Sequence, residues 1–143
     1  MTIKFKHGCV YQDFFKLHPR VIEIYGFIVF YCNIHYEITP SITSMLRPKA
    51  DDSGVHETGR ALDFSEFEYN SGGIDIVKTM TKKAIKDLLS IVNDLFPRED
   101  GKETLIYHDV GRGKHFHLQV EYHQSWYNNE RVNIALSKER RAS

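Results

Sequence analysis

The hydrophobic and polar positions along the chain predict two helices, each followed by two strands. Apolar residues cover most of the segment 19–36, "PRVIEIYGFIVFYCNIHY", and its proline stands in the first turn, where a helix tolerates it. This pattern predicts a largely buried helix, although the β-branched residues of 21–34 leave a pair of strands open as the alternative. Alternating residues then predict a strand that ends near Ser44 and another over about 61–68.

The second half of the chain predicts one amphipathic helix followed by two strands. Apolar residues recur at helical spacing from Ile74 to Leu95, with Asp75 near the start and Pro97 as the stop. The segments "TLIYHDV" and "HFHLQVEY" look like two strands joined by the glycine-containing turn "GRGK". The sequence contains no repeat or linker, so it predicts one α+β domain over 1–143. We expect an antiparallel sheet with helices packed on one side.

Composition narrows the classes of protein to consider. With 143 residues, 41% of them hydrophobic, the chain can form one sizeable core. Lysine plus arginine equal aspartate plus glutamate at 19 each, so no global charge favours nucleic acid. Cys9 and Cys32 follow no paired motif and are expected to be free thiols. No segment is apolar enough for a signal peptide or a membrane span, so we expect synthesis in the cytoplasm.

The last predicted strand, "HFHLQVEY", has two chemically different faces. Side chains alternate across a strand, so His115, His117 and Gln119 share one face. The other face carries Phe116, Leu118 and Val120, which suit a buried core. The strand is therefore predicted to be anchored by its apolar face and to present two imidazoles on the other.

A carboxylate and a third imidazole occur together earlier in the chain. Asp63 lies in the predicted strand "ALDFS", and its neighbours Leu62 and Phe64 should point into the core, leaving Asp63 on the opposite face. His56 precedes this strand in a loop, where Gly59 gives the backbone room to turn. Two such histidines and one aspartate would make three zinc ligands and leave a fourth position for water, as in catalytic zinc sites.

Each of these residues also has an ordinary structural explanation. A single histidine beside an apolar strand, such as His56 or His117, is usually a packed or surface residue. Asp63 could cap a turn or form an ion pair with Arg60. Spacing alone therefore does not decide between a metal site and ordinary packing.

The stretch "ITSMLRPKADDSGVHETGRALDF" resembles a known family of enzymes. It is similar to the zinc D-Ala-D-Ala carboxypeptidases and to the phage and bacterial peptidoglycan endopeptidases, among them L-alanyl-D-glutamate endopeptidases. "HFHLQ" resembles the late strand that carries their last histidine, and the Hedgehog signalling domain shares the fold and a similar H-x-H. The resemblance covers about 37–122. The matching positions are Arg47, Ser53, His56, Gly59, Ala61 and Asp63.

The resemblance implies a Hedgehog/DD-peptidase-like fold that holds one zinc ion through His56, Asp63 and His117. His117 is preferred to His115 because the second histidine of the H-x-H is the ligand in the related domains. His115 would then donate a hydrogen bond to a bound oxyanion or water. Alternatively, it would orient His117.

Two residues before His56 would contact the substrate. Arg47 resembles the family arginine that steadies the substrate near the scissile amide, although it could instead form a salt bridge with Asp51 or Asp52. Ser53 resembles a serine that hydrogen-bonds the substrate backbone, although it could simply form a turn. The substrate implied is a peptidoglycan stem peptide.

The expected catalytic base is missing from its usual place. Amide hydrolysis needs a group that takes the proton of the attacking water and passes it to the leaving amine. Many family members have a carboxylate three residues before the last histidine, but here that residue is Lys114. Our hypothesis is that Asp109 is the base, brought back by the turn "GRGK", and Glu57 and Glu121 are weaker candidates.

The sequence therefore leads to one main hypothesis and two alternatives. The main hypothesis is a monomeric zinc peptidase of phage-lysin type that reaches the cell wall by a separate release route. The first alternative is a non-catalytic zinc module that recognises a cell-wall peptide or a protein partner. The second is a phage structural or accessory protein that binds cell-wall peptides.

Overall fold

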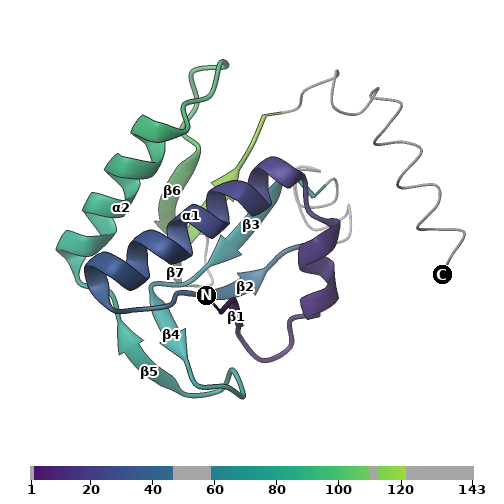
Figure 1. Cartoon of the computed structure of the whole chain (residues 1–143), viewed down its shortest axis with the longest axis vertical. Helices are drawn as coiled ribbons and strands as arrows, with labels where there is room; N and C mark the ends of the chain where they lie inside the picture. The colour runs from purple at the N-terminus through teal and green to yellow at the C-terminus, as the bar shows by residue number, and fades with distance from the viewer. Residues whose placement is uncertain (1, 47–58, 110–112, 122–143) are drawn as a thin grey trace, which may run out of the picture.

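The computed structural model describes residues 2–46, 59–109 and 113–121. Five strands form one sheet in the order β1-β2-β3-β7-β6, and β4 and β5 form a separate pair (Figure 1). The elements are β1 (Lys4–Phe5), the short 3-10 helix η1 (Tyr11–Lys16), α1 (Pro19–Tyr36), β2 (Ser41–Ser44), β3 (Ala61–Phe64), β4 (Phe67–Tyr69), β5 (Ile76–Thr79), α2 (Lys82–Leu95), β6 (Leu105–Asp109) and β7 (Lys114–Gln119).

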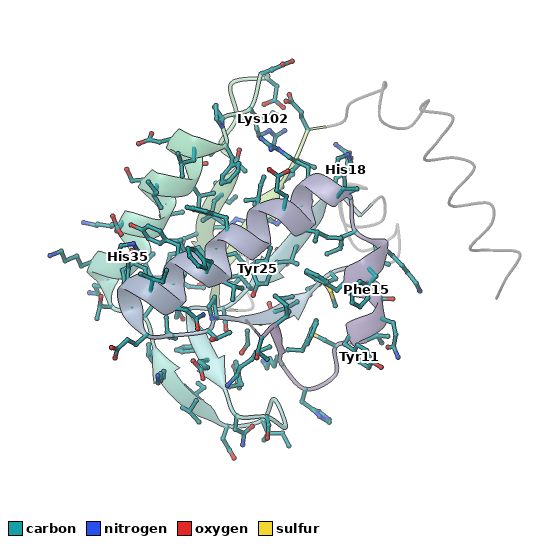
Figure 2. The ribbon with its side chains drawn as sticks, in the orientation of Figure 1. Tyr11, Phe15, His18, Tyr25, His35 and Lys102 are labelled. Carbon is teal, nitrogen blue, oxygen red and sulfur yellow. The ribbon has the colours of Figure 1, made fainter. Side chains whose placement is uncertain are left out.

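Helix α1 has the bounds that the sequence predicts and lies across the sheet. The imidazole of His18 accepts a hydrogen bond from the Arg20 N–H at 3.0 Å and so caps the first turn. Tyr25, labelled in Figure 2, is fully buried, and its ring centroid lies 5.3 Å from that of Phe64 on β3. Its hydroxyl donates to the Pro40 carbonyl at 3.1 Å, so the only polar atom of this side chain is satisfied inside the core.

The fold class is α+β, as predicted, but the sheet is mixed rather than antiparallel. β1 pairs with β2 in parallel, whereas the β2–β3, β3–β7 and β6–β7 pairs are antiparallel. A parallel neighbour needs a crossover, and here η1 and α1 supply it between β1 and β2. The pattern of the two residues Lys4–Phe5 is too short to predict such a strand.

The strand predicted over 61–68 is in fact two strands in two sheets. β3 ends at Phe64 and β4 begins at Phe67. Between them, the hydroxyl of Ser65 donates to the Phe67 carbonyl at 2.9 Å and accepts from the Phe67 N–H at 3.2 Å. A serine side chain that bonds nearby backbone groups competes with the strand ladder, which explains the break.

The predicted start of the second helix, near Ile74, is also wrong. Residues 76–79 form β5, which pairs with β4, and α2 begins only at Lys82. Thr81 caps the helix, because its hydroxyl accepts a hydrogen bond from the Ala84 N–H at 3.1 Å. Ile74 and Val77, which continue the helical spacing in the sequence, are exposed.

Helix α2 secures the outer edge of β6 through one side-chain amide. The Asn93 amide nitrogen donates to the Leu105 carbonyl at 2.9 Å, and its oxygen accepts from the Thr104 and Leu105 N–H groups at 2.8 and 2.9 Å. The backbone N–H and C=O groups of Leu105 point away from β7 and bond the Asn93 amide, which occupies the place that a further strand would take. These bonds fix β6 against the rest of the fold.

Both cysteines are free thiols, as the sequence predicts. Burial raises the pKa of the Cys32 thiol to about 12, so this residue behaves as a packed apolar group. Within the described ranges, no helix has the length and apolarity needed to cross a membrane.

Gly59 fixes the entry into β3 and gives a test of the backbone there. Its φ is +74°, and a Cβ at this position would lie 3.1 Å from the Lys16 carbonyl oxygen. Its own carbonyl accepts a hydrogen bond from the His18 N–H at 2.9 Å. We expect Gly59→Ala to lower the free energy of unfolding by about 2–4 kcal/mol, because left-handed backbone strain and close packing add up.

Urea denaturation of Gly59→Ala beside Gly101→Ala separates the two costs. Gly101 has nearly the same φ, +79°, but has open space around its Cβ position. Its alanine variant should lose only the conformational cost of about 1–2 kcal/mol. Equal losses in the two variants would mean that the approach to Lys16 costs nothing.

Candidate metal centre

β7 presents its imidazoles on the face of the sheet opposite α1. Phe116 and Leu118 are fully buried in the core, and Phe116 stacks on Phe64 with ring centroids 4.7 Å apart. His115 and His117 alternate with them and lie on the other face, as the sequence predicts. The packed apolar face thus holds the two imidazoles on β7, an inner strand that lies between β3 and β6.

Asp63 and His117 are brought together by the pairing of β3 with β7. They are register partners in this antiparallel pair, so their side chains leave the sheet on the same face. Leu62 and Phe64 on either side of Asp63 are fully buried, as predicted, while Asp63 is 5% exposed. β3 is the central strand of the sheet, which places this carboxylate where few charged groups are found.

The His117 ring is held at both nitrogens. Its Nδ1 lies 2.8 Å from Asp63 Oδ1 and its Nε2 lies 2.9 Å from Gln119 Oε1. The His117 side chain is 15% exposed, so the ring is enclosed but still reachable. These two contacts fix the orientation of the imidazole ring.

The His115 ring lies on the other side of the same carboxylate. Its Nε2 is 3.8 Å from Asp63 Oδ2, and its Nδ1 is 3.2 Å from the Gly113 carbonyl oxygen. The carbonyl can only accept, so Nδ1 carries the proton. Each oxygen of the Asp63 carboxylate therefore faces one of the two imidazoles.

These donor atoms fit a zinc ion in type. Zinc binds imidazole nitrogen and carboxylate oxygen, and adjacent ligand atoms of a tetrahedral site at its usual bond lengths lie about 3.3 Å apart. The separation of Asp63 Oδ1 from His117 Nδ1 is 2.8 Å, which a small opening of the pair would match. Zinc held by these two atoms would replace their hydrogen bond, and the proton of that bond would be released to solvent.

Three of the sequence-predicted site residues, Arg47, Ser53 and His56, lie outside the described residues. Within 2–46, 59–109 and 113–121, no group of three or more His, Cys, Asp or Glu side chains is arranged to hold a metal ion. The implied ligand set takes its third member, His56, from the loop before β3. Of the ligand set that the resemblance implies, the described residues include Asp63 and His117.

His108 on β6 also lies on this face, although no sequence motif surrounds it. It is the register partner of His115, and its ring centroid lies 4.9 Å from that of His115 and 5.8 Å from that of His117. Burial, followed by the two neighbouring imidazoles, lowers the pKa of His108. The sequence signal that could have found it is the predicted hairpin, because a four-residue turn at 111–114 would pair 108 with 117 on this face. β7 instead begins at Lys114, and the register pairs His108 with His115.

Two carboxylates interact or pair with Lys114, one at the end of β6 and one just after β3. Asp109 is the register partner of Lys114, is exposed, and raises the pKa of His108 through its charge. Strand alternation directs Asp109 to the face opposite the imidazoles. Burial raises the pKa of Glu66, which follows β3, and the charges of Lys114 and His115 partly oppose this shift.

Comparisons with known proteins give no relative. Neither models of protein families nor searches of curated proteins and of solved structures produced a match.

Proposed function

We propose that this protein is a zinc-dependent peptidase with a Hedgehog/DD-peptidase-like fold that hydrolyses an amide bond in a peptidoglycan stem peptide. The zinc ligands in this proposal are His56, Asp63 and His117. Arg47 and Ser53 hold the substrate, His115 donates to the developing oxyanion, and Asp109 takes up the proton of the attacking water.

One observation carries the proposal. Asp63 and His117 are 54 residues apart in the sequence, yet they are register partners with a carboxylate oxygen 2.8 Å from a ring nitrogen. Placing a charged side chain in the central strand costs free energy unless a partner compensates it. The resemblance rests on two separate sequence motifs. The contact between Asp63 and His117 brings one residue of each motif together.

The roles of the chain's own residues follow from their places on this face. When bound, zinc supplies Lewis acidity that activates a water molecule and polarises the amide carbonyl. His115 carries its proton on the nitrogen facing Gly113, and its other nitrogen faces the Asp63 carboxylate. Donation to a substrate oxygen on this face would come from Nε2, which would need a second proton for this role.

Proton transfer is the step assigned to Asp109. The water must lose a proton as it attacks, and the leaving amine must gain one. Asp109 lies beside Lys114 at the end of β6, next to His108, and would have to turn toward the imidazole face to accept that proton.

A digest of purified peptidoglycan tests the proposed function. The zinc-loaded protein should release fragments with new amino termini or with lost terminal residues, detected by mass spectrometry. His117→Ala should lower the rate by more than about 1,000-fold, because loss of a ligand removes the metal and its charge stabilisation. The fragment masses would identify the bond that is cleaved.

The matched control is His35→Ala, a histidine on α1 away from the candidate site, whose ring is tilted by 39° against that of Tyr31 with centroids 4.2 Å apart. This variant should digest peptidoglycan at the wild-type rate. A folded protein that binds zinc in equal proportion and releases no fragments would overturn the proposed activity.

A second candidate function is supported by Lys114. This residue stands where the family has its carboxylate, and its register partner Asp109 leaves the strand on the face away from the imidazoles. A zinc site without a nearby base would bind a cell-wall peptide or a protein partner without cleaving it. Retention of intact stem peptides by the zinc-loaded protein, without fragments, would favour this alternative.

A further inference from the structure

β6 is locked to β7 in a register that puts His108 directly beside His115. The Gln119 N–H donates to the Thr104 carbonyl at 2.9 Å, which identifies this pair as one that exchanges hydrogen bonds. In an antiparallel ladder such pairs recur at every second residue, so His108 and His115 form one too. Their backbones are therefore tied together and their side chains leave the sheet side by side.

The His108 ring contacts both imidazoles of β7. It meets His115 edge to face, with ring planes at 66° and centroids 4.9 Å apart, and it is tilted by 52° against His117 at 5.8 Å. His115 is thus enclosed on two sides. Asp63 faces it from β3, with Oδ2 at 3.8 Å from Nε2, and His108 faces it from β6.

We infer that His108 is a positioning residue of this site and that its ring holds the imidazole of His115 in the orientation needed to reach the substrate oxygen. The inference rests on the proposed function for the role of His115, but the contact itself does not. His108 acts through the shape of its ring, because an edge-to-face contact depends on ring geometry and not on a hydrogen bond.

Two substitutions separate ring packing from the other properties of His108. His108→Phe keeps an aromatic ring in place and removes both nitrogens, whereas His108→Ala removes the ring. We expect kcat to fall by about 10-fold to 100-fold in the alanine variant, with KM changed less than about twofold, because a misplaced group mainly affects the transition state. The phenylalanine variant should stay within about threefold of the wild type.

A double-mutant cycle shows whether this effect passes through His115. In a His115→Ala background, replacing His108 by alanine should change kcat less than about twofold, because the group that His108 positions is already gone. Independent losses that multiply in the double variant would overturn the inference.

A readout that needs no activity is the ring-nitrogen NMR spectrum of His115. The Nδ1–H that faces the Gly113 carbonyl gives a signal that reports the orientation and proton position of this ring. The signal should shift or broaden in His108→Ala and keep its position in His108→Phe. His35→Ala, remote from the site, should leave it unchanged.

The two kinds of failure are distinguishable. A wild-type protein that does not cleave peptidoglycan would overturn the proposed function, while a His115 signal that still responds to His108→Ala would support the positioning contact. A His115 signal that is the same in the wild type and in His108→Ala would overturn the inference, whatever the activity. Equal zinc affinity in all variants is expected, because His108 is not a ligand.

Discussion

Replacing Asp63 by asparagine is expected to abolish zinc binding and peptidoglycan cleavage while the protein stays folded. The substitution keeps the shape of the side chain and an oxygen that can accept from His117, but it removes the negative charge. Even residues that only support metal ligands cost about 10–100-fold in metal affinity when mutated, so loss of a ligand charge should cost more than about 100-fold.

Thermal unfolding with and without zinc measures this effect without any assay of activity. Zinc at 100 times its dissociation constant should stabilise the wild type by about 2.7 kcal/mol, and a 100-fold weaker site should retain only about 0.4 kcal/mol under the same conditions. Asp94→Asn, on the exposed side of α2, is the matched control and should respond to zinc as the wild type does. A full zinc response in Asp63→Asn would remove Asp63 from the ligand set.

Replacing Asp109 by asparagine should lower kcat by about 100-fold to 10,000-fold, the usual contribution of a general base, while zinc affinity stays unchanged. The reason is that Asp109 is the described carboxylate next to both His108 and Lys114 on the β6–β7 hairpin. Rates of peptidoglycan digestion and equilibrium zinc titrations on the same preparations would measure kcat and zinc affinity separately.

Glu66→Gln is the comparison that makes the Asp109 experiment decisive. Glu66 also interacts with Lys114 and His115, but from the end of β3, on the other side of β7. We expect its variant to keep the wild-type kcat within about threefold. The opposite result, with a large loss in Glu66→Gln and none in Asp109→Asn, would show that the proton acceptor comes from β3 and that the assignment of Asp109 is wrong.

The parts of the fold that sequence reasoning predicts are those with a strong local pattern. The helix Pro19–Tyr36 has a proline in its first turn and apolar residues around most of its surface. The alternation in β7 predicts the buried Phe116 and Leu118 and, with them, the face of His117. These features depend on neighbours along the chain, so the sequence contains enough information to predict them.

The element boundaries that sequence reasoning misses depend on local hydrogen bonds and strand pairing, which compete with the hydrophobic pattern. The spacing of Ile74 and Val77 continues that of α2, but pairing of β5 with β4 and the hydroxyl cap of Thr81 start the helix later. Likewise, Ser65 ends β3 with bonds to its own neighbour Phe67. A single local hydrogen bond decides each boundary, and periodicity does not record it.

In the candidate site, too, some residues follow from local sequence patterns and others do not. Motif spacing leads to Asp63 and His117, whereas the position of His108 depends on the register between two strands. That register includes the bond of the Gln119 N–H to the Thr104 carbonyl, and Asn93 holds the start of β6. Contacts of this kind join residues that are distant in the sequence. Local sequence patterns therefore do not predict the place of His108 in the site.

The amide of Asn93 has a further consequence for how the protein behaves in a crowded solution. An unpaired strand edge is a template on which another molecule can add a strand and start an ordered aggregate. At Leu105 this template is already filled by a group with the same donor and acceptor as a peptide bond. Deamidation of Asn93 would replace the donor by a negative charge facing the Leu105 carbonyl, so chemical ageing at this one side chain would reopen the edge.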